Sequence, residues 1–238
     1  MLQRNPSAVL NYLLRAMAEP DRSGLVPHLE RVPLKRAEVI LQPDAPFEYV
    51  YFLESGVASI VATPPDGRRI EVGLYGREGF GSTAIVLGDD RSAHEHIMQI
   101  PGEGLRLSAK TMLKAIQHSP SLNGLLLKYA RVLQLQMAQT ALSNGNYSLA
   151  ERLARWLLMC HDRVDGDEIS ITHQALGIML AVRRSGVTLA IQTLESAHII
   201  RAFRGCLIVR DRAKLEEIAG GSYGPAEAAY ERLIGPMR

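Results

Sequence analysis

The sequence has few cysteines, and their positions exclude several kinds of site. Its 238 residues include only Cys160 and Cys206, which lie far apart without C-x-x-C or Cys/His ligand spacing. Structural zinc sites, iron–sulfur clusters and disulfide frameworks need several such ligands at short spacings. We therefore predict two reduced, buried thiols and no metal ligands.

Long apolar runs are also missing. No stretch approaches the roughly 20 apolar residues of a membrane span. An apolar segment at about residues 8–17 contains Arg15, is followed by Glu19, and has no small-residue cleavage site after it. These features predict a cytoplasmic protein with no membrane partner.

Charge of one sign is not in excess. The formal net charge is +2, and the composition of 47% hydrophobic and 22% charged residues is typical of a globular protein. A basic patch that binds nucleic acid would have to be local, because the overall charge does not predict one.

The common catalytic motifs are absent. The sequence has no Walker loop, no G-x-S-x-G and no H-E-x-x-H, and its carboxylates fall mainly in expected turns and on helix surfaces. We interpret Glu54 as a turn residue, and Asp89-Asp90 beside Arg91 as an ion pair. The prediction is a protein that is not an enzyme and has no catalytic residues.

Residues 32–107 show the pattern of short antiparallel strands. Val, Tyr, Phe and Ile alternate with other residues, and turn signals stand at Glu54-Ser55-Gly56 and at Pro64-Pro65-Asp66-Gly67. This segment predicts a β-roll or a barrel-like half.

Helical spacing follows the strands. Ser108 is a candidate N-cap for a helix that ends at Ser119-Pro120. From Ser121 to about Ser143, apolar residues recur every three or four positions on more than one face. One stripe can cover the β half while another packs on a second copy of the chain, and a well-buried helix in a monomer is the alternative.

The sequence after this helix predicts a second structural unit. Asn144-Gly145-Asn146 is predicted to break the helix and act as a hinge, and Ser148 with Glu151 forms a capping box for the next one. Towards the end, a strand pair turns at Arg204-Gly205, a short helix covers residues 213–219, and a tail follows Gly220-Gly221.

The stretch ITHQALGIMLAVRRSGVTLAIQTLESAHII, residues 171–200, predicts a helix-turn-helix. Thr172 can cap a first helix, a turn lies near residues 180–182, and a second helix runs to about Ala197. The apolar residues that would meet in one core are Leu176, Met179, Val187, Ile191 and Leu194.

Two adjacent arginines open the second helix. A guanidinium there can donate two hydrogen bonds to O6 and N7 of guanine in the major groove. Without such a partner, a cation near a helix N-terminus is slightly unfavourable, because that end of the helix dipole is positive. A solvated charged corner is the alternative. Arg201 and Arg204 are assigned to the phosphate backbone. The complete predicted DNA-binding set is Thr172, His173, Gln174, Arg183, Arg184, Ser185, Thr188 and Arg204.

Taken together, these segments resemble the Crp/Fnr family of bacterial transcription regulators over nearly the whole chain. Arg184 and Val187 match the leading arginine and helix valine of the family's DNA-binding signature. The resemblance implies an α+β fold with a cyclic-nucleotide-binding-like β-roll sensor (residues 1–120), a dimerisation helix with its hinge (residues 121–145) and a winged helix-turn-helix (residues 146–238). It also implies a homodimer that reads a palindrome with half-sites about 34 Å apart. Double-stranded DNA, a second copy, RNA polymerase and an unidentified small effector are the implied partners.

The reading helix departs from the family at two positions. Ser185 stands where the cyclic-AMP receptor has a glutamate, and Leu189 stands where it has a second base-reading arginine. The half-site of this chain is therefore expected to differ.

The effector region is less similar to the family. The residues that match its phosphate-binding cassette and entry are Phe80, Gly81, Ser82, Arg91, Ser92 and Ala93. Ser82 replaces the glutamate that binds the ribose, and Leu133 and Gln134 lie near the positions of the base-binding hydroxyls. Since each lost hydrogen bond costs about 1 kcal/mol or more, we predict no cofactor, and a cyclic nucleotide stays open as the less favoured alternative.

Other sensing chemistries lack their ligands. The N-terminal cysteines of an oxygen-sensing iron–sulfur cluster are missing. His94 and His96 share a strand face but have no third ligand, so we interpret them as surface or hydrogen-bonded residues. An unidentified effector and ligand-independent DNA binding both stay open, and so does the alternative of a cyclic-nucleotide-binding module that acts through protein partners.

Overall fold

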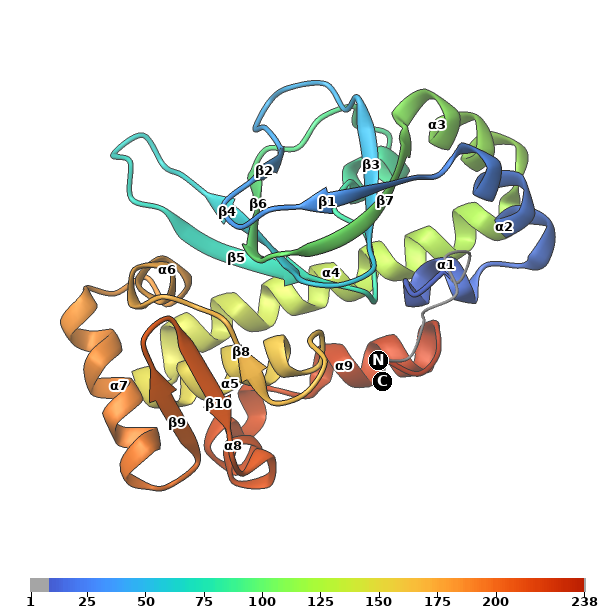
Figure 1. The fold of residues 1–238 in the computed structure, drawn as a ribbon. Helices are drawn as coiled ribbons and strands as arrows, with labels where there is room; N and C mark the ends of the chain where they lie inside the picture. Colours follow the sequence, from blue (N-terminus) through green and yellow to red (C-terminus); the bar gives the residue numbers. More distant parts are fainter. Residues whose placement is uncertain (1–8, 238) are drawn as a thin grey trace.

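The computed structural model describes residues 9–237, so the first eight residues of the predicted sensor domain lie outside it. A β-roll packs above a long helix, and a smaller α/β unit lies below the β-roll beside the C-terminal half of that helix (Figure 1). Two short helices, α1 (Tyr12–Ala16) and α2 (Glu19–Leu25), precede the β-roll. The mixed architecture confirms the predicted α+β class.

Two antiparallel sheets form the β-roll. They have the strand orders β1-β7-β3 and β2-β6-β4-β5. Gly56 and Gly67 adopt positive φ of 80° and 76° in the two turns predicted from the sequence. The elements are β1 (Glu30–Leu34), β2 (Val39–Leu41), β3 (Tyr49–Leu53), β4 (Val57–Ala62), β5 (Ile70–Tyr75), the 3-10 helix η2 (Thr83–Leu87), β6 (Glu95–Ile100) and β7 (Gly102–Ser108).

Serine caps begin the next two helices. Ser108 accepts from the amide of Thr111 at the start of α3 (Ala109–His118), as predicted, and Ser119 accepts from the amide of Leu122 at the start of α4 (Pro120–Asn146). Although α4 is long, neither it nor any other helix within residues 9–237 is apolar enough to cross a membrane.

The predicted break at Asn144-Gly145-Asn146 is wrong. These residues belong to the last turn of α4, which ends at Asn146 with Tyr147 as its C-cap. Gly and Asn cost a helix interior about 1 kcal/mol or less each, and continued backbone hydrogen bonding outweighs that preference. The chain turns at Tyr147 because Ser148 caps the next helix there.

The unit after α4 is a winged helix-turn-helix. Ser148 and Glu151 form the predicted capping box of α5 (Leu149–His161). A small sheet of order β8-β10-β9 flanks the two helices of the motif, with β8 before them in the chain and β9 and β10 after them. Its elements are β8 (Glu168–Ile169), α6 (His173–Met179), α7 (Arg184–Ser196), β9 (Ile200–Phe203), β10 (Cys206–Val209) and α8 (Arg212–Ala219).

The segment predicted as a tail contains a helix. Helix α9 (Pro225–Leu233) begins after Gly224 and packs along α4 (Figure 1). Tyr230 is buried and donates its hydroxyl to the carbonyl of Glu78 in the β-roll at 2.9 Å. The C-terminal segment therefore returns to the sensor instead of staying with the winged unit.

The core of the winged unit is continuous with one face of the β-roll. Val57, Val61, Leu74 and Ile100 from the roll belong to the same buried cluster as Trp156, Met179 and Val187 from the winged unit. Burial of this apolar surface fixes the position of the reading helix relative to the sensor.

Candidate nucleic-acid interface and effector region

The two helices of the motif meet as their apolar spacing predicts. Thr172 accepts from the amide of Ala175 and caps α6. The turn between the helices places Ala181 at a positive φ of 52°, and the amide of Val182 donates to the carbonyl of Gly177. All five predicted core residues are buried, namely Leu176, Met179, Val187, Ile191 and Leu194.

The first turn of α7 presents cationic and polar side chains to solvent. Arg183, Arg184 and Ser185 are exposed, and Arg183 caps the helix without a side-chain hydrogen bond. Within residues 9–237, neither arginine forms an ion pair with a carboxylate. Both guanidinium groups therefore keep their donors for a ligand.

The end of α6 nearest this turn adds further polar groups. His173 lies beside α7, with its Nδ1 3.5 Å from the hydroxyl of Thr188, which itself donates to the carbonyl of Arg184. Gln174 and Thr172 are exposed. The structure thus brings seven of the eight predicted DNA-binding residues to the N-terminal ends of the two helices.

Arg204 lies apart, in the wing. It occupies the turn between β9 and β10, where Gly205 has a φ of 76°. Arg201 on β9 lies over the ring of Phe203, with 5.0 Å from its guanidinium carbon to the ring centroid. Both arginines are exposed, so the wing presents two cations.

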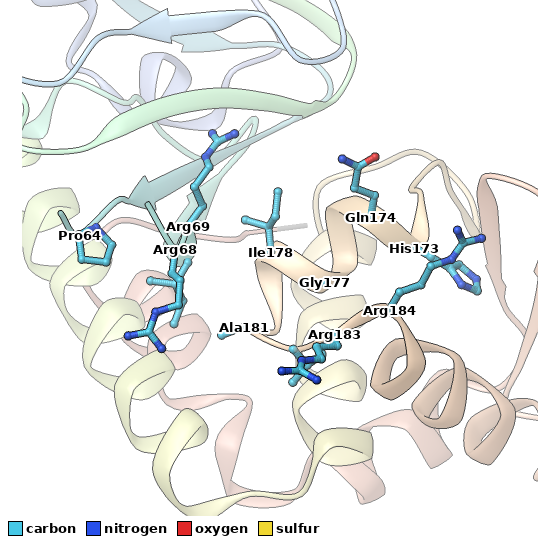
Figure 2. Close-up of a pocket in the computed structure, with 12 residues that line it drawn as sticks. Pro64, Arg68, Arg69, His173, Gln174, Gly177, Ile178, Ala181, Arg183 and Arg184 are labelled. Atoms are coloured by element: carbon cyan, nitrogen blue, oxygen red, sulfur yellow. The ribbon is translucent and has the colours of Figure 1, made fainter. Parts of the chain in front are cut away.

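A cleft of about 780 Å³ separates the helix-turn-helix from the hairpin that joins β4 to β5. Figure 2 shows Arg68 on the hairpin side and Arg183 and Arg184 on the side of α7. Arg68 pairs with Asp66 and Arg69 pairs with Glu95. Because carboxylates offset both hairpin arginines, the positive charge that would attract a polyanion to the cleft comes mainly from Arg183 and Arg184.

A buried polar contact joins the β-roll to the winged unit. Trp156 on α5 donates its indole N–H to Oε1 of Glu71 on β5 at 2.9 Å, and Ser59 on β4 donates to the other carboxyl oxygen. The Ser59 hydroxyl also lies 3.3 Å from the sulfur of Met179 on α6. Burial raises the pKa of Glu71 to about 7, although the two hydrogen bonds oppose that rise.

A second contact between the units is ionic. Arg163, which follows α5, lies 2.8 Å from Oε1 of Glu78, and both side chains are buried. Arg163 also donates to the carbonyl of Met159 at 2.6 Å. No motif identified Glu71, Trp156, Glu78 or Arg163 in the sequence, because each pair is separated by 85 residues.

Three of the predicted effector residues are packed into the β-roll. Phe80 is fully buried and stacks on Phe52, with ring centroids 5.4 Å apart, and lies 5.5 Å from the ring of Tyr129 on α4. A Cβ atom at Gly81 would lie 2.1 Å from the hydroxyl of Tyr75. Only glycine fits there without displacing that tyrosine.

Two buried hydroxyls in this region have no hydrogen-bond partner within the part of the chain that the structure describes. They are Ser82 Oγ and Tyr129 Oη. Burial of an unpaired hydroxyl costs roughly 1–3 kcal/mol, so both are available to a polar ligand or water. The uncharged Ser82 hydroxyl is a weaker acceptor for a ribose hydroxyl than a carboxylate, because hydrogen bonds to a charged acceptor are roughly twice as strong.

The other three effector candidates lie towards the surface. Arg91 is exposed, pairs with Asp90 at 2.8 Å, and donates to the carbonyl of Asp44. Ser92 donates to the carbonyl of His94, and Ala93 is exposed. The ion pair interpreted from Asp89-Asp90 and Arg91 is present with Asp90. The six residues therefore divide between the core and the surface of the β-roll.

The histidine and cysteine candidates for ligation are hydrogen-bonded or buried. His96 lies 3.2 Å from both the Tyr75 hydroxyl and the Ser92 hydroxyl, and burial lowers its pKa to about 3. Both cysteines are free thiols, and Cys160 is buried as predicted, whereas Cys206 is only half-buried. No cluster of three or more possible metal ligands occurs in residues 9–237.

Glu54 is more than a turn residue. Its buried carboxylate pairs with Arg31 on β1 and accepts from the amide of Leu10. The carboxylate therefore connects the N-terminal segment to the β-roll, which its place beside Ser55-Gly56 in the sequence does not indicate.

Comparison with protein families identifies both halves of this arrangement. Residues 31–119 match the cyclic nucleotide-binding domain, and residues 151–218 match the Crp-like helix-turn-helix domain. Comparison with curated protein sequences found no match.

Solved structures share the fold at low sequence identity. FixK2 from Bradyrhizobium japonicum is 18% identical with a TM-score of 0.69, over 81% of this chain and 98% of that one. TTHB099, a CRP-family transcriptional regulator from Thermus thermophilus, is 19% identical with a TM-score of 0.66, over 81% and 97%. The c-di-GMP responsive global regulator CLP from Xanthomonas campestris is 18% identical with a TM-score of 0.59, over 81% and 99%. The two matched domains, their order and this shared fold show that the chain belongs to the Crp/Fnr family of DNA-binding transcription regulators.

Proposed function

We propose that the chain binds duplex DNA as a homodimer and reads a two-fold symmetric site through α7. The observation that carries this proposal is the exposed first turn of α7, where Arg183 and Arg184 have no carboxylate partner within residues 9–237. A helix end of this kind fits the major groove, whose base edges accept hydrogen bonds from arginine.

Each predicted residue has a role in this complex. Arg184 donates its paired N–H groups to a guanine, with Arg183 and Ser185 beside it at the base edges or phosphates. Thr172, His173, Gln174 and Thr188 face the same groove wall, and Arg204 in the wing contacts the phosphate backbone of the neighbouring groove. Such contacts supply position and affinity, whereas Arg184 supplies sequence preference.

The second copy would pack against α4. Exposed residues recur along this helix at steps of three and four, namely Leu127, Arg131, Gln134, Ala138, Ala141 and Leu142. Leu127 and Leu142 are 41% and 43% exposed, and Leu87 on the neighbouring η2 is 68% exposed. A monomer would leave the exposed leucines and alanines of this stripe in water, whereas a two-fold pair of α4 helices buries them.

An unidentified small effector is the proposed regulatory ligand, and cyclic AMP is not. Ser82 replaces the acceptor that a ribose needs, and the guanidinium of Arg91 is engaged by Asp90. The unpaired hydroxyls of Ser82 and Tyr129 lie where η2 meets α4, so a ligand there can alter how the two α4 helices pack. An effector acts only through different affinities for the two arrangements of the reading helices. We expect RNA polymerase as a further partner, in a bacterial cytoplasm.

Selection of random duplex DNA by the purified protein tests the function. We expect an enriched palindrome whose half-sites are about one helical turn apart. Arg183→Ala/Arg184→Ala should lose the enrichment because it removes the guanine contact, while Arg22→Ala, on a sensor helix, should keep it. Added cyclic AMP should change neither result.

Two outcomes would count against the proposal. Binding by the double variant that equals the native protein would show that α7 does not read the site. Absence of enrichment in the native protein, together with retained capture of a protein partner by the double variant, would support the module that acts through protein partners.

Sedimentation of the purified protein tests the dimer separately. Leu127→Glu/Leu142→Glu should convert a dimer to a monomer because it introduces like charges into the apolar stripe. Leu113→Glu, at an exposed leucine on α3, should leave the dimer intact. A native protein that sediments as a monomer at micromolar concentration would overturn this part.

A further inference from the structure

Helix α7 exposes one leucine on its solvent face. Leu189 is 65% exposed, whereas Val187, Ile191 and Leu194 of the same helix are buried in the core. Its neighbours at the start of the helix are cationic or polar, so Leu189 is an apolar side chain within a surface otherwise suited to hydrogen bonding. A side chain of this size loses favourable burial unless the ligand of the helix covers it.

The position of Leu189 places it within reach of the bases. It lies one turn beyond Ser185, on the same side of the helix, because residues four apart are neighbours. It lies five residues beyond Arg184, or about 7.5 Å along the axis at 1.5 Å per residue. Since base pairs stack about 3.4 Å apart, Leu189 meets a base two or three pairs from the one that Arg184 contacts.

The nearby threonine hydroxyls do not compete for that base. Thr188 donates its hydroxyl to the carbonyl of Arg184 at 3.1 Å, and Thr193 donates to the carbonyl of Leu189 at 3.0 Å. Both donors are used within the helix. The Leu189 side chain therefore decides what fits at this level of the groove.

A leucine can recognise only one feature of the major-groove edges. Adenine, guanine and cytosine present nitrogen and oxygen atoms there, and thymine adds the 5-methyl group, which takes apolar contacts. We propose that Leu189 is a specificity-determining residue that packs on a thymine methyl in each half-site. This inference rests on the proposed function, because it needs α7 to enter the major groove.

The methyl group can be removed from the DNA without altering its hydrogen bonds. The test uses the palindrome selected by the native protein and replaces the thymine two or three pairs from the Arg184-dependent guanine with deoxyuridine, one half-site at a time. Loss of one buried methyl should weaken native binding about fourfold per half-site. Leu189→Ala should bind the thymine and deoxyuridine duplexes equally, while Leu189→Met should retain the preference for thymine.

Leu113→Ala is the matched control, because it truncates an exposed leucine on the sensor and should keep the full deoxyuridine effect. The inference is overturned if native binding is unchanged by deoxyuridine, if no thymine occurs at that distance from the guanine, or if Leu189→Ala keeps the same preference. In each of these cases a palindrome that depends on Arg183 and Arg184 would still support the proposed function. Failure of the native protein to select any DNA would overturn both.

Discussion

Trp156 of the winged unit donates its indole N–H to the buried carboxyl group of Glu71 in the β-roll at 2.9 Å. Because this contact joins the two units, the protonation of Glu71 is linked to their packing. Burial raises the pKa of Glu71 from its ordinary value of 4.5 to about 7. Separation of the units exposes the carboxyl group to water and returns the pKa to its ordinary value.

The first prediction follows from the sign of that shift. The packed arrangement binds the proton more tightly than the separated one, so it is most favoured below about pH 4.5 and loses stability as the pH rises through 7. Trp156 is the only tryptophan, so its fluorescence reports this contact directly. We expect an emission change with a midpoint near pH 7, and none in Glu71→Gln. A native signal that is flat from pH 6 to 8 would contradict the prediction.

The second prediction concerns the buried pair of Glu78 and Arg163. Glu78→Gln leaves the guanidinium buried without its counter-charge and should lower the free energy of unfolding by about 3–5 kcal/mol. Glu78→Gln/Arg163→Met should recover much of that loss because no unpaired charge remains. Urea unfolding followed by circular dichroism measures both.

The exposed pair of Glu19 and Arg22 provides the comparison for that experiment. Glu19→Gln should cost far less than Glu78→Gln, because water screens this pair. Equal losses from Glu19→Gln and Glu78→Gln would show that the Glu78 pair is not buried in solution.

The third prediction compares two glycines. Gly81→Ala should lower the free energy of unfolding by about 1–3 kcal/mol, because its new methyl group overlaps the Tyr75 hydroxyl. Gly124→Ala, inside α4 with open space around it, should raise stability by about 0.5–1 kcal/mol. Thermal unfolding of the two variants should therefore shift in opposite directions. A Gly81→Ala protein as stable as the native one would show that the roll is looser around Tyr75.

The fourth prediction separates position from sequence preference at the DNA. Arg204→Ala removes an exposed cation from the wing and should weaken binding to all sequences alike, with a salt dependence reduced by about one unit of slope. Arg184→Ala should instead relax the preference at one base pair of each half-site. Binding isotherms at several salt concentrations, on the selected palindrome and on a scrambled duplex, distinguish the two. A change of consensus in Arg204→Ala would assign base contact to the wing.

Local signals in the sequence predict the elements that local chemistry determines. The serine caps at Ser108 and Ser148 and the apolar spacing of α6 and α7 each act within a few residues, and the structure confirms them. The turn predicted at Asn144 to Asn146 is wrong, because the preference of Asn and Gly for turns is weaker than the backbone hydrogen bonding that continues the helix.

Contacts between distant segments have no such signal. Glu71 and Trp156 are 85 residues apart, and nothing in either neighbourhood indicates the other. Helix α9 is missed by the sequence analysis because its apolar side is short and packs on distant segments, α4 and the β-roll. In the effector region, the residues that match the family's cassette can be identified from the sequence. The contact between Phe80 and Tyr129 cannot, because Tyr129 lies on α4, outside the cassette.

The return of α9 to the β-roll restricts how the reading helix can move. If the Glu71 and Arg163 contacts and the shared core between the units separate, the winged unit stays joined to the rest of the chain through Tyr147 at its start and through the Tyr230 contact with Glu78 at its end. A body held at one point can rotate about any axis through it, whereas a body held at two separated points can rotate only about the line between them. The last helix thus confines any reorientation of α7 to a single arc for as long as Tyr230 stays in place.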